Sequence, residues 1–193
     1  MAHPKLLSSE QISQTALRLV EHGDVDGLSL RAVAAELGVR APSLYRYFAD
    51  KEALEIAVAE EIVGIMLVKF RTAVKAPDPE TRFRRVAETY LRFARERFPL
   101  YAFVIQDRIA RYPSAAGKDL WNILLDAASG VSGQADDTAA AVATWSFLHG
   151  YATLERSGAF GASGPKGGLE RGIEAFLNSF RAGSTEPRED VTP

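Results

Sequence analysis

The sequence predicts an all-helical protein with an N-terminal helix-turn-helix domain and a C-terminal helical bundle. Apolar residues recur at helical spacing along most of the 193 residues, and no stretch has the alternation of a half-buried strand. One segment, Gly27 to Leu54, places a glycine between two short helical runs and is followed at once by a third. We expect domains at residues 1–50 and 51–182, and a polar, disordered tail at 183–193.

The first helices can be argued from their ends. A helix is expected from Ser9 to Glu21, where apolar residues fall in phase. Ser29 is a suitable N-cap for a second helix from Leu30 to Leu37. Gly38 ends that helix, because glycine adopts positive φ at no steric cost. The next helix is expected to begin near Ala41.

This next helix has two unlike faces on a 3.6-residue wheel. Leu44, Tyr47 and Phe48 share one side. We expect Leu44 and Phe48 to be part of the core, and core packing is also the alternative for Tyr45. The other arc carries hydroxyls, an aromatic ring and a guanidinium, the groups that touch phosphates and base edges. Its residues are Pro42, Ser43, Tyr45 and Arg46. The pattern predicts a helix that enters the DNA major groove.

A long third helix follows directly. Asp50 is its expected cap, and the apolar phase continues from Lys51 to about Val74. A lysine at this helix start opposes the helix dipole, so we expect Lys51 to serve a phosphate. The rod would connect the helix-turn-helix to the rest of the chain.

The residues from Leu28 to Leu54 resemble the DNA-binding domain of the TetR/AcrR family of repressors. The resemblance lies in the runs LSLRAVAAELGV, APSLYRYF and ADKEAL. It implies that Arg31 reaches a base or phosphate, and that Ser43, Tyr45 and Lys51 contact phosphates and base edges. Tyr47 stands where the family often has histidine, and Ala41 where many members have a polar residue. The full predicted DNA-binding set is Ser29, Arg31, Arg40, Ala41, Pro42, Ser43, Tyr45, Arg46, Tyr47 and Lys51.

The remaining chain is expected to consist of helices. They are predicted from Pro79 to about Arg97, Leu100 to about Arg111, Ser114 to about Gly130, Asp136 or Asp137 to Gly158, and Leu169 to Phe180. Phe98 and Pro99 are expected to end the first of these. The glycine-rich run at 158–168 is expected to be a loop.

Large aromatic and apolar side chains from several of these helices have two interpretations. They form an ordinary packed core, or they line a small-molecule cavity with a few polar groups. The predicted pocket residues are Met66, Phe70, Tyr90, Phe93, Phe103, Gln106, Trp121, Trp145 and His149. The run from Trp145 to Tyr151 resembles the Trp-His-Gly pattern of one C-terminal class of the family.

Two apolar stripes predict a homodimer. The last helix and the helix before it would pair with their copies in a four-helix, two-fold interface. The alternative is that the last helix packs only on its own subunit. The predicted interface residues are Leu148, Tyr151, Ala152, Leu169, Ile173, Phe176, Leu177 and Phe180.

The charge, the lack of cysteine and the absence of enzyme motifs limit the functions that the chain is expected to have. The net charge is −2, and residues 1–60 carry six Lys or Arg against nine Asp or Glu, so a basic footprint must be local. There is no cysteine, and no metal-ligand spacing, nucleophile elbow or phosphate-binding loop. We therefore expect no enzyme, no catalytic residue, no cofactor and no metal site. No signal peptide or membrane span is apparent, which favours the cytoplasm.

The function that the sequence predicts is a DNA-binding transcriptional repressor, released from a palindromic operator by a small-molecule effector. The effector would favour one arrangement of the C-terminal helices and so change the spacing of the two recognition helices. The alternative is a helical binding or carrier protein that has lost DNA binding, as the acidic balance of residues 1–60 and Ala41 would allow.

Overall fold

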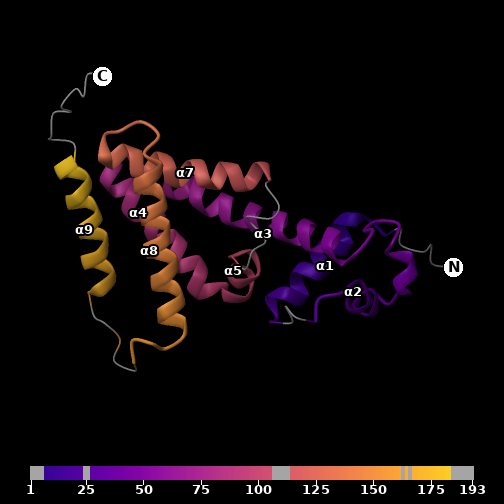
Figure 1. The fold of residues 1–193 in the computed structure, drawn as a ribbon. Coiled ribbons are helices and arrows are strands. Elements are labelled where there is room, and N and C mark those ends of the chain that lie inside the picture. The colour runs from indigo at the N-terminus through magenta and orange to yellow at the C-terminus, as the bar shows by residue number, and fades with distance from the viewer. Residues whose placement is uncertain (1–6, 24–26, 106–113, 162–163, 165–166, 184–193) are drawn as a thin grey trace, which may run out of the picture. The chain divides into compact units, whose positions relative to one another are not determined.

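The computed structural model describes residues 7–23, 27–105, 114–161, 164 and 167–183. Within these ranges the secondary structure is helical and contains no strand, which confirms the all-helical prediction (Figure 1). The elements are α1 (Ser9–Glu21), α2 (Leu30–Glu36), the 3-10 helix η1 (Ala41–Ser43), α3 (Lys51–Ala73), α4 (Pro79–Glu96), α5 (Phe98–Ile105), α7 (Ala115–Ser132), α8 (Thr138–Arg156) and α9 (Gly168–Gly183).

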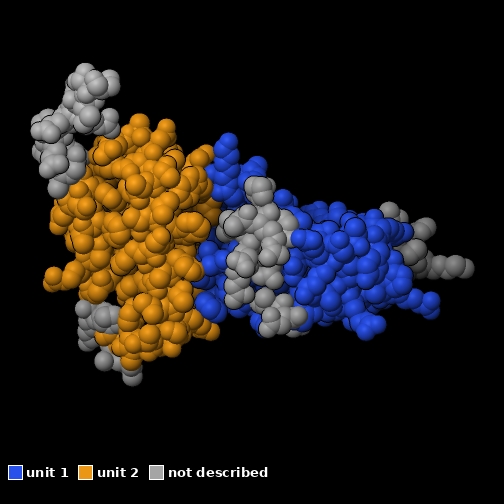
Figure 2. Space-filling view, viewed as in Figure 1, with its two compact units in different colours: residues 1–67, 96–118 blue, residues 68–95, 119–193 orange. Residues whose placement is uncertain are grey.

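The chain divides into two compact units (Figure 2). Unit 1 contains residues 1–67 and 96–118, and unit 2 contains residues 68–95 and 119–193. Helices α3 and α7 each continue from one unit into the other. Compactness alone does not define where a domain ends, so the limits of 1–50 and 51–182 stay a prediction.

Unit 1 is built around α1, which packs against α2 and α5. Its core consists of aliphatic side chains from α1, α2, α3 and α5, two aromatic rings from α5, and the ring of Phe48. The largest fully buried members are Ile12, Leu28, Leu44, Leu54, Ile62, Met66, Leu100 and Phe103. An ion pair joins Arg97 Nη2 to Glu21 Oε1 at 2.6 Å, so the residue before α5 is also tied to the last residue of α1. The Ser13 hydroxyl of α1 donates to the Glu61 carboxylate of α3.

Several helices begin at the side-chain caps that the sequence predicted. Ser29 Oγ accepts from the Ala32 amide at 3.1 Å, and Asp50 Oδ1 accepts from the Ala53 amide at 2.8 Å. Of the two candidate aspartates before α8, Asp137 is the cap, because its Oδ1 accepts from the Ala140 amide at 3.0 Å.

The helix predicted to end at Phe98 and Pro99 does end there, because α4 stops at Glu96. The next helix starts two residues earlier than the predicted Leu100, so both residues lie in the first turn of α5. Proline is tolerated there, since a first-turn amide needs no partner within the helix. The predicted end of this helix near Arg111, like Gln106 and the tail from residue 184, lies outside the described residues.

Unit 2 packs α4, α8 and α9 around an aromatic-rich core. Phe83 and Phe93 of α4 are almost fully buried, as are Leu148 of α8 and Leu177 of α9. Between α8 and α9 the rings of Phe147 and Phe176 lie 5.4 Å apart, and Phe176 contacts Phe180 at 5.8 Å. Such offset and edge contacts add to the gain from burial alone. The last helix is therefore held by its own subunit along one face.

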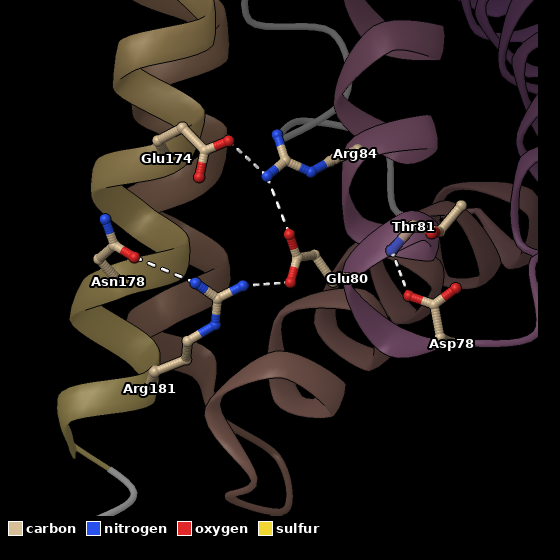
Figure 3. A network of polar contacts seen from close by, with 7 residues as sticks. All are labelled: Asp78, Glu80, Thr81, Arg84, Glu174, Asn178 and Arg181. Carbon is tan, nitrogen blue, oxygen red and sulfur yellow. Dashed lines mark hydrogen bonds and ion pairs between the residues drawn. The ribbon is translucent and has the colours of Figure 1, made fainter.

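A polar network connects α4 to α9 on the surface of unit 2 (Figure 3). Arg84 Nη2 lies 2.9 Å from Glu80 Oε1 and 2.6 Å from Glu174 Oε1. The other Glu80 oxygen pairs with Arg181, whose second Nη donates to Asn178 Oδ1 at 3.1 Å. The hydrogen bonds from Arg84 and Arg181 lower the pKa of Glu80 below its ordinary value. The network joins the middle and the C-terminal part of α9 to the N-terminal part of α4.

The close approach of α8 and α9 places the ring of the half-buried Phe147 against Gly172. A Cβ placed on Gly172 would overlap the Phe147 ring, lying only 2.7 Å from Cε2. We predict that Gly172→Ala destabilises the protein by roughly 1–3 kcal/mol, as overpacking does. Urea unfolding measures the loss. Gly64→Ala is the matched control, because nothing lies within 4 Å of its Cβ position and the change should stabilise α3. Equal stability of Gly172→Ala and wild type would contradict the packing.

The Glu80 network predicts a pH-dependent contribution to stability. Because the folded-state pKa of Glu80 is lowered, its contribution is complete above the ordinary value of 4.5 and is lost as the pH falls below it. Glu80→Gln should lower the thermal midpoint at neutral pH by a small amount, and the difference from wild type should vanish in acid. Glu88→Gln, an exposed change on the same helix, is the control. A Glu80→Gln deficit that persists unchanged at low pH would contradict the assignment.

Candidate nucleic-acid interface

The turn after α2 has the geometry that a helix-turn-helix requires. Gly38 adopts φ +68°, its amide donates to the Ala35 carbonyl at 3.1 Å, and the Val39 amide donates to the Ala34 carbonyl at 2.9 Å. This Schellman pairing satisfies the last carbonyls of α2 and reverses the chain. Ala34, the residue whose carbonyl accepts the second of these bonds, is buried.

The segment after the turn is not the regular α-helix that the sequence predicted. It is the 3-10 helix η1 followed by hydrogen-bonded turns up to Phe48. The Ser43 and Tyr47 amides both donate to carbonyls three residues earlier, at 2.9 Å. The Ser43 hydroxyl also donates to the Arg40 carbonyl at 2.7 Å, and such local bonds compete with helix formation. Pro42 lies in the first turn, where an amide needs no partner within the helix, so it is tolerated in this segment.

The two predicted faces of this segment are nonetheless present. Leu44 is fully buried and Phe48 is 7% exposed, so both anchor the segment in unit 1. Tyr45 is 55% exposed, so the alternative that it packs in the core is wrong. Arg46 is also exposed. The structure therefore presents a phenol and a guanidinium side by side to solvent.

Tyr47 was predicted to contact DNA, but its side chain is occupied within unit 1. The hydroxyl donates to the Leu7 carbonyl at 2.5 Å, and the ring lies 4.9 Å from Cζ of Arg46. Sequence reasoning missed both contacts. A bond between residues 40 positions apart leaves no local signal in a sequence.

The other predicted DNA-contacting residues lie around this segment. Arg31 and Arg40 are exposed, Ala41 is half-buried, and Ser29 serves as the cap of α2. Lys51 has a side chain 52% exposed, and its Nζ lies 3.6 Å from Glu55 Oε1. At this distance the two side chains form a weak surface ion pair. A DNA phosphate could replace Glu55 as the partner of Lys51 at little cost in free energy.

The predicted pocket residues fall in both units. Met66 and Phe103 are buried in unit 1, whereas Phe70, Tyr90 and Phe93 are buried in unit 2. Trp145 Nε1 donates to the Tyr90 hydroxyl at 3.3 Å and its ring meets Trp121 edge-on at 6.3 Å. His149 is half-buried. Their assembly into one ligand pocket stays a prediction.

The predicted dimer residues divide by burial. Leu148, Ile173, Leu177 and Ala152 are buried within the chain, whereas Tyr151, Leu169, Phe176 and Phe180 are half-buried. A second side of α8 is exposed and carries no charge, which the sequence reasoning did not single out. Its residues are Ala139, Val142, Ala143, Ser146, Thr153 and Leu154.

The described residues contain neither a metal-binding cluster nor a membrane-spanning helix. Over the described ranges, no cluster of three or more His, Asp or Glu side chains is arranged to hold a metal ion. None of the helices in that part of the chain is both long and apolar enough to span a membrane.

Comparison with known proteins gives a consistent result for both halves of the chain. The profile of bacterial regulatory proteins of the tetR family matches residues 12–58, and that of the tetracyclin repressor-like C-terminal domain matches residues 83–176. The class C tetracycline repressor protein of Escherichia coli is 41% identical over 59 residues, which are 31% of this chain and 27% of that repressor. The chain thus aligns with about a quarter of that relative's length.

Longer matches are more distant in sequence. An uncharacterized HTH-type transcriptional regulator of Mycobacterium tuberculosis is 26% identical over 82% of this chain and 74% of its own length. Among solved structures, a protein of unknown function from Rhodococcus sp. RHA1 has a TM-score of 0.73 at 24% identity, covering 95% of this chain and 97% of its own. A TetR-family regulator from Streptomyces coelicolor has a TM-score of 0.58 at 19% identity, covering 90% and 97%. These structures share the fold, and the named relatives are transcriptional regulators.

Proposed function

The chain belongs to the TetR family of bacterial regulatory proteins, and on that premise we propose that it is a transcriptional repressor which binds a palindromic DNA operator as a homodimer. A small-molecule effector would release it. The observation that carries the proposal is the outward pair Tyr45 and Arg46, on a segment anchored from below by Leu44 and Phe48. Hydroxyl and guanidinium groups at such a turn suit phosphates and base edges.

The surrounding residues take roles that fit their exposure. Lys51 and Arg40 would contact phosphates, and Arg31, exposed in the first turn of α2, would reach a base edge or phosphate. Ala41 would contribute an apolar contact to a thymine methyl group. The sugar-phosphate backbone of DNA would pass close to Ser29, Pro42 and Ser43. Because the chain carries a net charge of −2, this local set must supply the attraction for DNA, and binding should be strongly salt-dependent.

Effector release would work by a shift between two arrangements of the helices. Helix α3 continues from unit 1 into unit 2 without a break, so a change in its direction is passed along its length. In unit 1, α5 packs on α1 and Arg97 pairs with Glu21, so a displacement of α5 would also act on α1. An effector shifts DNA affinity only by as much as it prefers one arrangement.

A repressor of this kind would also need an effector site and access to DNA. The effector would bind among the aromatic residues of the C-terminal helices, with Trp121, Trp145 and Tyr90 at one side. The protein would have no enzymatic activity and no cofactor, and it would act in the cytoplasm, where its DNA is. These assignments follow from its proposed role.

The dimer would form through α8 and α9, as the apolar stripes predicted. Leu148, Ile173 and Leu177 are already covered by their own subunit, so they would support the interface from beneath. The exposed, uncharged side of α8 would supply its contact surface, together with the half-buried aromatic residues beside it. Small residues such as Ala139 and Ala143 would let two copies of α8 approach closely.

A DNA-shift assay with the region upstream of the protein's own gene tests the DNA-binding proposal. Wild type should bind that fragment, and Lys51→Ala should weaken binding to every DNA sequence alike and lower the salt slope by about one. Lys69→Ala, an exposed lysine later on α3, is the control. Unchanged affinity for Lys51→Ala would remove it from the interface. Absence of binding by wild type would instead favour a helical carrier protein.

The dimer proposal is tested by placing a charge on the exposed side of α8. Ala143→Glu should yield monomers in sedimentation and should weaken operator binding at the same time, because a single recognition segment reads too few base pairs. Ala143 is exposed in the single chain, so the substitution should leave the helical content intact. Ala115→Glu, exposed on α7, should leave the oligomeric state unchanged. An intact dimer for Ala143→Glu would place the interface elsewhere.

A further inference from the structure

Tyr47 lies within the candidate DNA-contacting surface, yet both functional parts of its side chain are in use without DNA. The hydroxyl donates to the Leu7 carbonyl at 2.5 Å, and the ring lies 4.9 Å from Cζ of Arg46. The residue is half-buried, whereas its neighbours Tyr45 and Arg46 are exposed. A phosphate that bound the phenol directly would have to break the bond to Leu7.

We propose that Tyr47 is a positioning residue: its ring holds the Arg46 guanidinium ready for a DNA phosphate, and its hydroxyl fixes the start of α1 against the recognition segment. The proposal rests on the DNA-binding function proposed above. It assigns the phosphate contact to Arg46 and removes it from Tyr47.

The cation–π contact leaves Arg46 able to bind. Its Cζ lies over the Tyr47 ring, 4.9 Å from the centroid, and this contact uses the charge of the guanidinium without occupying its five N–H donors. Arg46 is exposed and has no ion pair in the part of the chain that the structure describes. A long side chain normally loses rotamer freedom when it is ordered by a ligand. The contact with the Tyr47 ring restricts the Arg46 side chain before DNA binds. Less conformational entropy is therefore lost when a phosphate binds.

The hydroxyl of Tyr47 holds the chain at the start of α1. Leu7 immediately precedes Ser8, whose Oγ accepts from the Gln11 amide at 3.1 Å while the Gln11 side chain accepts from the Ser8 amide at 3.3 Å. This capping box begins α1. The bond from Tyr47 therefore joins the recognition segment to the chain just before α1.

A double-mutant cycle with a mixed-sequence DNA duplex, measured over a salt series, tests the proposal. Arg46→Gln should weaken binding several-fold and lower the salt slope by about one, as loss of one phosphate contact does. Tyr47→Leu should weaken binding in the wild-type background but cause no further loss in the Arg46→Gln background. Tyr47→Phe keeps the ring but removes the bond to Leu7, so it should weaken binding less than Tyr47→Leu does, while speeding hydrogen exchange at the start of α1.

Three results would overturn the proposal. Additive losses for Tyr47→Leu and Arg46→Gln would show that the two act independently, and equal losses for Tyr47→Phe and Tyr47→Leu would show that the hydroxyl itself contacts DNA. If Tyr47→Leu does not fold, Tyr47→Met decides, because the flexible methionine adapts to the site without supplying an aromatic ring. It should bind more weakly than wild type, and equal binding contradicts positioning by the ring. Absence of duplex binding by wild type would overturn the DNA-binding function itself.

Discussion

The burial of Leu44 and Phe48 is the constraint on which the candidate site depends. These two side chains fix how the segment after Gly38 is rotated, since an apolar residue of this size gains about 1.5–3 kcal/mol when it leaves water. With Leu44 and Phe48 inward, Tyr45 and Arg46 point to solvent. The positive φ of Gly38 allows this burial, because it reverses the chain within two residues of α2. The exposed surface is thus a consequence of the core beneath it.

Two kinds of interaction hold the remaining helices in place. Apolar packing dominates, and in unit 2 it is tight enough between Gly172 and Phe147 to exclude even a methyl group. Polar pairs then join elements that are distant in the sequence: Arg97 with Glu21 in unit 1, and Arg84 of α4 with Glu174 of α9 in unit 2. Exposed pairs contribute little individually. Their importance lies in which elements they join, since each connects segments far apart in the sequence.

Much of the fold was predictable because it is encoded locally. Helix starts at Ser29, Asp50 and Asp137 follow from short polar side chains that bond to nearby amides. The alternation of inward and outward residues around Leu44 was likewise visible in the sequence. The winding of the recognition segment was not, because Ser43 favours a local bond over a regular helix. The hydroxyl bond of Tyr47 could not be predicted either, since it depends on the tertiary placement of Leu7. How the predicted pocket residues assemble is a tertiary question of the same kind.

The central claim is that this chain binds DNA through the surface around the turn at Gly38. The most direct measurement is the change in backbone amide NMR signals when an operator-containing duplex is added to the isotope-labelled chain. The account predicts the largest changes at Arg31 and from Gly38 to Lys51, with salt-dependent amplitude. Signals of exposed residues on α4, such as Glu88, should not move through direct contact. Changes confined to α4, α8 and α9, or no change at any DNA concentration, would contradict it.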